Sequence, residues 1–145
     1  MSPPPRRQPI GLELARTARV VSSAFERAMS EAGGSASTWQ VLLLVRSGRW
    51  EAQSRMAEAL GITGATLTHH LNALEQRGLI RRWRDAGNRR VQQVALTGEG
   101  EALFDRLRDV AAGYDRRLRS NLTDQDVERL TELLGKLRAT LDGTG

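Results

Sequence analysis

The sequence contains no cysteine, a single lysine and only two histidines among its 145 residues. Without cysteine the chain forms no disulfide, no cysteine-ligated zinc site and no thiol redox sensor. The two histidines, His69 and His70, are adjacent. Neighbours on a helix diverge by about 100°, so they do not chelate one metal ion together. The sequence therefore predicts no metal site.

The sequence also lacks a long apolar segment. Its longest apolar run, Val41–Val45, is too short to cross a membrane, and the Pro- and Arg-rich start is unlike a secretory signal. We therefore expect a cytoplasmic protein. Apolar residues make up 39% of the chain and charged residues 27%, which is typical of a globular protein. The length suits one domain with an oligomerisation element.

The positive charge comes almost wholly from arginine. The formal net charge of +5 and the pI of about 11.1 favour a polyanionic partner, although a solvated basic surface gives the same balance. The position of the arginines is more informative than the net charge, because a DNA-binding element needs its basic residues close together. The guanidinium of arginine suits phosphates and guanine edges. Between residues 77 and 90 six arginines stand against one acid, Asp85: Arg77, Arg81, Arg82, Arg84, Arg89 and Arg90.

Apolar periodicity and turn residues predict a mainly α (α+β) chain with six helices and one hairpin. Ser37, Thr97 and Thr123 are the expected N-caps of the second, fifth and sixth helices, and Asp126 completes a weak capping box. The apolar second helix should be central. The expected helices cover about 10–32, 38–46, 53–60, 64–77, 98–120 and 124–142, and Thr63 is the N-cap of the fourth helix or lies next to it. The strands cover 79–83 and 90–96, joined by a turn at 85–88.

The pattern from Gln53 to Leu74 predicts a helix-turn-helix. Ala57 allows close helix approach, Gly61 suits the turn, and Leu67, Leu71 and Leu74 fix the second helix from inside. A helix held in this way fits the major groove of DNA. A solvent-exposed polar helix would carry the same outward residues, which are Thr63, Ala65, Thr66, Thr68, His69 and Asn72.

The basic hairpin follows this pattern directly. Arg89 and Arg90 stand at the end of its turn, where an arginine can enter a narrow minor groove. Ser37 and Arg77 are further candidates for contacts with the DNA backbone. The alternative is that the arginines only cover a strand edge.

The sequence resembles the MarR (multiple antibiotic resistance regulator) family. The resemblance is carried by Met56–Gly100 and is most specific at "LEQRGLI" (74–80), "NRR" (88–90) and "VALTGEG" (94–100). It implies a winged helix-turn-helix lobe at 36–100 and a helical dimerisation region at 10–35 and 101–145. The Pro-rich start, residues 1–9, is expected to be a flexible arm. The resemblance also implies a homodimer on double-stranded DNA at the nucleoid, with Arg90 in the minor groove. Family members commonly repress nearby genes and release DNA when a small molecule binds.

The sequence departs from the family pattern at three positions. Asn88 replaces an aspartate of the wing, and Asn72 stands where an aspartate is common. His70 occupies a position that is usually apolar. We expect it to face partly inward, neutral and hydrogen-bonded, the alternative being a pH-sensing or DNA-contacting role.

Other classes of protein fit the sequence less well. No spacing suggests a catalytic zinc, and Gly61 and Gly64 belong to the helix-turn-helix rather than to a phosphate loop, so we expect neither an enzyme nor a cofactor. The alternative function is an architectural protein that binds DNA without a preferred site. No residue of the sequence is assigned to an effector.

Overall fold

The computed structural model describes residues 8–48 and 53–143, without the side chains of 88–91. Most of the arm predicted at 1–9 lies outside the described residues. Residues 1–110 and 111–145 form two compact units, and each is considered by itself.

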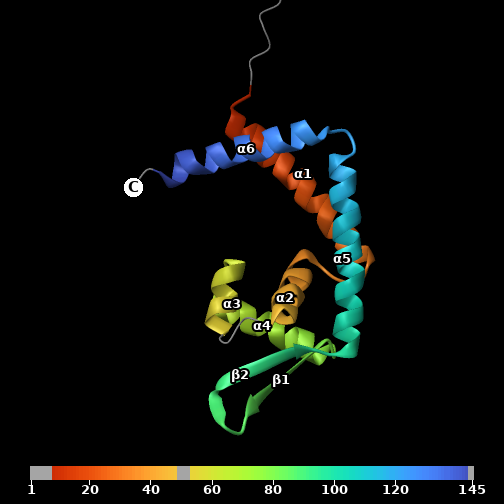
Figure 1. The fold of residues 1–145 in the computed structure, drawn as a ribbon, viewed down its shortest axis with the longest axis vertical. Helices are drawn as coiled ribbons and strands as arrows, with labels where there is room; N and C mark the ends of the chain where they lie inside the picture. Colours follow the sequence, from red (N-terminus) through yellow and green to blue (C-terminus); the bar gives the residue numbers. More distant parts are fainter. Residues whose placement is uncertain (1–7, 49–52, 144–145) are drawn as a thin grey trace, which may run out of the picture. The chain divides into compact units, whose positions relative to one another are not determined.

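The described chain has the predicted mainly helical architecture (Figure 1). Its only sheet among the described residues is an antiparallel pair of strands. The elements in chain order are α1 (Ile10–Glu31), α2 (Ala36–Ser47), α3 (Gln53–Leu60), α4 (Gly64–Gln76), β1 (Ile80–Asp85), β2 (Asn88–Leu96), α5 (Gly98–Arg119) and α6 (Asp124–Asp142).

Local signals account for most helix ends. Gly48 and Gly61 follow α2 and α3 with φ of +63° and +69°, a conformation that costs glycine little. The expected N-cap of α2 at Ser37 is wrong. Ser35 takes this place, because its hydroxyl accepts the backbone N–H of Thr38 at 3.0 Å. Ser37 instead lies inside the first turn of α2.

The core of the first unit forms around α2, as its composition predicted. Val41, Leu42 and Val45 are buried, and they share this core with Leu67 and Leu71 of α4. The remaining buried apolar side chains come from α1, α3, the end of α4, the turn into β1, the start of β1 and α5: Met29, Met56, Ala57, Leu74, Leu79, Ile80, Leu103, Phe104 and Leu107.

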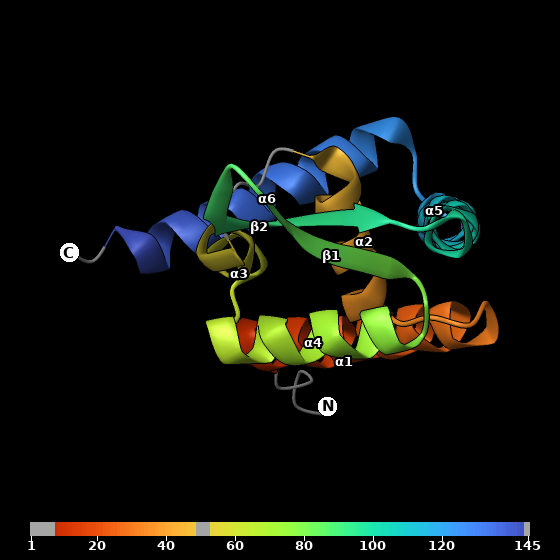
Figure 2. The ribbon, with the colours of Figure 1, turned by 90° about the horizontal axis from the view of Figure 1, so that it is seen from below.

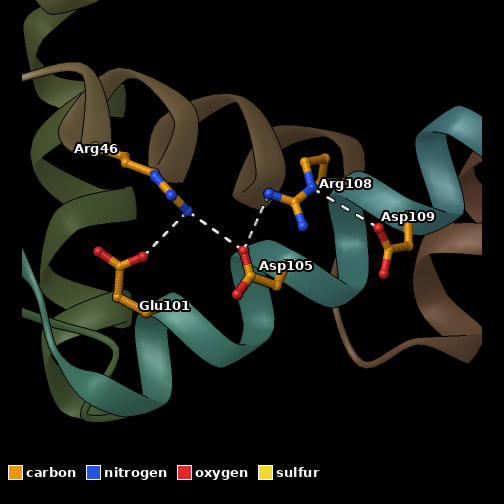
Figure 3. Close-up of polar contacts among 5 residues, drawn as sticks. All are labelled: Arg46, Glu101, Asp105, Arg108 and Asp109. Carbon is orange, nitrogen blue, oxygen red and sulfur yellow. Dashed lines mark hydrogen bonds and ion pairs between the residues drawn. The ribbon is translucent and has the colours of Figure 1, made fainter.

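A polar bridge joins α2 to the first half of α5 (Figure 3). Arg46 Nη1 lies 3.1 Å from Glu101 Oε2 and 3.3 Å from Asp105 Oδ1, and its guanidinium lies over the ring of Phe104. Asp105 also pairs with Arg108. These charges are about half exposed, so the bridge orients α2 on α5 more than it stabilises the fold.

The junction between α4, β1 and α5 is closed by Thr97. Its hydroxyl donates to the carbonyl of Gly78 at 2.6 Å and accepts the backbone N–H of Gly100 at 3.1 Å. Thr97 therefore caps α5, as predicted, and also ties this cap to the end of α4.

The two strands of the hairpin extend further toward its turn than predicted (Figure 2). Ile80 pairs with Leu96, and Asp85 pairs with Asn88 after a register shift at Arg84/Asp85. Asp85 and Asn88 were expected in the turn. They belong to the strands instead, because they pair with each other and leave only Ala86 and Gly87 as the turn.

In the second unit, α6 begins with the predicted capping box. Thr123 Oγ1 accepts the N–H of Asp126, and the Asp126 carboxylate accepts the N–H of Thr123. None of the described side chains of α6 is buried in this chain. Leu130, Leu133, Leu137 and Leu141 are 39–78% exposed. Within residues 8–48 and 53–143, no helix has the length and apolarity needed to span a membrane.

Candidate nucleic-acid interface

Helix α4 presents the predicted outward face. Thr63 is its N-cap, while Leu67, Leu71 and Leu74 are buried beneath it. The other side is exposed and carries no acid between residues 63 and 72. Its exposed side chains include all six predicted contact residues: Thr63, Ala65, Thr66, Thr68, His69 and Asn72.

The hydroxyl groups of the threonines on this face form some of their hydrogen bonds within the helix. Thr63 Oγ1 accepts the N–H of Thr66 at 3.1 Å and lies 2.9 Å from the Thr66 hydroxyl. Thr68 donates its hydroxyl proton to the carbonyl of Gly64 at 3.0 Å. The Thr68 oxygen is then left to accept, whereas one hydroxyl of the Thr63–Thr66 pair keeps a proton to donate.

His70 is half-buried, as expected, between α4 and α2. It borders a cavity of about 30 Å³ together with Ser37, Gln40, Val41, Leu60 and Ile62. Among the described residues, none forms the expected hydrogen bond with its ring. Several of the neighbours around this cavity are apolar. His69, by contrast, is exposed on the outward face.

Arg82 joins the hairpin to α4. Its Nη2 donates to Glu75 Oε1 at 3.0 Å and to Asn72 Oδ1 at 2.5 Å, and its backbone N–H donates to Glu75 Oε2 at 3.1 Å. We call this set of contacts the Arg82 clasp. The Arg82 side chain is only 13% exposed, and its Nε is buried without a partner.

The clasp shifts the titration of Glu75. The hydrogen bond from the Arg82 side chain, with its positive charge and backbone N–H, lowers the pKa of this carboxyl, and desolvation opposes the shift. Glu75 therefore holds Arg82 as a carboxylate at neutral pH.

This inward role of Arg82 was not predicted from the sequence, where Arg82 counts only as one arginine of the cluster. Strand alternation could have revealed it, because Arg82 lies two residues after the buried Ile80 and so shares its face of β1. On the same face, the Gln92 side chain accepts a 2.6 Å hydrogen bond from Gln53 of α3. The hairpin is thus tied to both helices of the helix-turn-helix.

The other arginines of the cluster differ in their surroundings. Arg81 and Arg84 are exposed, and the Arg81 guanidinium lies 4.9 Å from the centre of the Trp83 ring. The side chains of Arg89 and Arg90, the predicted wing contacts, lie outside the described residues.

The two predicted backbone contacts lie at opposite ends of their helices. Arg77 follows α4, is exposed, and donates from Nη2 to the carbonyl of Gly33 at 3.1 Å. Ser37 is exposed in the first turn of α2. No cluster of three or more histidine and acidic side chains suited to a metal occurs in the described part of the chain.

Comparison with known proteins places these features in a family. The sequence model of the MarR family matches residues 37–91. The HTH-type transcriptional regulator PecS of Dickeya dadantii (strain 3937) is 32% identical over 131 residues, which span 88% of this chain and 79% of PecS.

Solved structures agree with the sequence match. The transcriptional repressor CouR, bound to a 23-mer DNA duplex, is 27% identical with a TM-score of 0.78, over 90% of this chain and 92% of CouR. CouR from Rhodococcus jostii RHA1, bound to p-coumaroyl-CoA, is 26% identical with a TM-score of 0.71, over 88% of this chain and 90% of that one.

Proposed function

The chain belongs to the MarR family, and we propose that it is a sequence-specific regulator of transcription that binds double-stranded DNA through α4 and the β1–β2 hairpin. The observation that carries this proposal is the exposed face of α4. It offers short hydrogen-bonding side chains and an imidazole, has no acid between residues 63 and 72, and lies beside an arginine-rich hairpin. PecS and DNA-bound CouR support it as relatives of this chain.

In this proposal α4 enters the major groove. Ala65, Thr66, Thr68 and His69 face the base edges, and Thr63 and Asn72 contact bases or phosphates at the two ends of this face. Arg89 and Arg90 reach the neighbouring minor groove from the hairpin. Ser37 and Arg77 contact phosphates, and Arg77 keeps its bond to Gly33 with one nitrogen while the others remain for DNA.

The regulator acts as a homodimer in this proposal. Residues 10–35 and 101–145 form the dimerisation region, and residues 36–100 form the DNA-binding lobe. The exposed leucines of α6 supply an apolar surface for the second copy. Two copies of α4 then address half-sites about 34–36 Å apart, and the operator is approximately palindromic.

The proposal includes repression at the nucleoid in the cytoplasm and release by a small-molecule effector. CouR offers the precedent, since it has been solved with a DNA duplex and with p-coumaroyl-CoA. The chain is proposed to act by binding alone, without catalysis or a cofactor. Architectural binding without sequence preference is the competing function, and the two differ in specificity.

The experiment is an anisotropy titration of the protein on a labelled duplex from its own upstream region and on a scrambled duplex, over a range of salt concentrations. A regulator should prefer its operator by about a thousandfold or more, and its affinity should fall steeply with salt. Equal, salt-sensitive binding to both duplexes would favour the architectural function.

A further inference from the structure

The exposed face of α4 ends at Asn72, whose amide is already engaged on one side. Asn72 lies seven residues after Ala65, two helical turns along the same face, with Thr68 and His69 between them. Its side chain is nevertheless bound by the hairpin, because Arg82 Nη2 donates to its Oδ1 at 2.5 Å.

This contact fixes which end of the amide faces outward. The guanidinium of arginine has donors and no acceptor, so only the carbonyl oxygen of Asn72 can face it. The NH2 group therefore lies at the other end of the amide. No described residue accepts a hydrogen bond from it, and Asn72 is exposed.

The partner that holds the amide is itself immobilised. Glu75 binds both Nη2 and the backbone N–H of Arg82, and the Arg82 side chain is nearly buried. An asparagine that reads adenine uses its oxygen and its NH2 together, edge-on to the base. Arg82 already occupies one acceptor position of this oxygen, whereas the NH2 group has no described partner.

We propose that Asn72 contacts DNA as a hydrogen-bond donor only, oriented by the Arg82 clasp. Its partner is an acceptor of the duplex: a purine N7, a guanine O6, a thymine O4 or a phosphate oxygen. The inference rests on the proposed function and deepens it, since it states what one residue of α4 can recognise. An aspartate at this position would keep the bond to Arg82 but would have no proton to donate.

The test couples changes in the protein to changes in the operator. Affinities of wild type, Asn72→Ala and Asn72→Asp are measured on operator duplexes that carry single substitutions. These are 7-deazapurines, 2-aminopurine in place of guanine (which removes O6), thymine analogues without O4, methylphosphonates, or purine in place of adenine. Removing the acceptor that Asn72 contacts should weaken wild type about threefold to tenfold and leave both variants unaffected. Coupling to a base substitution would identify a base as the acceptor, and coupling to a methylphosphonate would identify a phosphate oxygen.

A merely structural role of Asn72 would lower the affinity of its variants for every duplex. Only a direct hydrogen bond from Asn72 would make the effect of a variant depend on one acceptor of the operator. Asn72→Asp retains an acceptor for Arg82, so its thermal unfolding temperature should be no lower than that of wild type. Asn72→Ala removes the donor without adding a charge. Coupling only to the adenine amino group, seen with purine, would overturn the inference, as would coupling at no position. If wild type itself does not prefer its operator to a scrambled duplex, the proposed function fails and the inference fails with it.

Discussion

At the scale of single residues, Glu75 shows how one carboxylate positions the hairpin. Both of its oxygens are occupied by Arg82, one by the side chain and one by the backbone. A neutral glutamine could accept from Arg82 but would offer it no charge. The contact is therefore strongest when Glu75 is ionised.

The lowered pKa of Glu75 predicts a pH dependence with a definite sign. A carboxyl with a depressed pKa contributes stability that is complete above the ordinary glutamate range and is lost as the pH falls through the lowered value. We expect Glu75→Gln to be less stable than wild type at neutral pH, with the difference shrinking in acid, as measured by urea unfolding over a pH series. The control is Glu58→Gln, which removes an exposed acid of α3 and leaves the clasp intact. A Glu75→Gln deficit that stays constant over the series would contradict the expectation.

Gly100 and Gly98 form a matched pair in the first turn of α5. A Cβ at Gly100 would overlap the carbonyl oxygen of Leu79, whereas a Cβ at Gly98 meets no atom within 4 Å. Gly100→Ala should therefore cost about 1–3 kcal/mol of unfolding free energy. Gly98→Ala should change it by less than about 0.5 kcal/mol. Equal effects in chemical denaturation would show that the α5–Leu79 contact is looser than described.

At the scale of the elements, α2 is held by apolar packing more than by its ion pairs. Leu42 is fully buried, while Arg46 bridges to α5 through half-exposed charges. Leu42→Ala should cost about 2–5 kcal/mol. Arg46→Ala should cost about 1 kcal/mol or less, and high salt should reduce the loss. A larger loss in Arg46→Ala than in Leu42→Ala, by denaturant titration, would reverse this ranking.

The elements that the sequence predicted well carry their signals locally. Gly61 ends α3, and Thr63, Thr97 and Thr123 cap helices, because each acts within three or four residues of its own position. The cap of α2 was misassigned because two serines stand two residues apart. Only the backbone geometry shows that Ser35 accepts the N–H of Thr38.

The candidate site was predictable where it follows helical periodicity. The leucines of α4 determine its outward face, and the structure exposes all six residues expected there. The clasp was not predicted, because it joins Arg82 to residues seven and ten positions earlier through the pairing of the hairpin. A charge cluster in a sequence does not show which arginine turns inward.

At the scale of the whole molecule, the exposed leucines of α6 lead to a test of assembly. Leu130 is 48% exposed on a helix that buries none of its described side chains within the chain. Leu130→Glu should weaken the proposed homodimer, because a carboxylate would enter an apolar contact. Sedimentation at micromolar concentration should then detect monomer. Thr131→Glu makes the same charge change at the next residue and is the control. Wild type that sediments as a monomer would contradict the homodimer.

The central claim, that α4 reads the DNA sequence, is tested most directly by selecting binding sites from random duplexes with wild type, Thr66→Ala, His69→Ala and Arg90→Ala. Changes at Thr66 or His69 should alter which bases are preferred at particular positions. Arg90→Ala should weaken binding broadly and leave the preferred sequence largely unchanged. If the α4 variants select the same sites as wild type with the same preferences, α4 does not read the sequence, and the account is wrong.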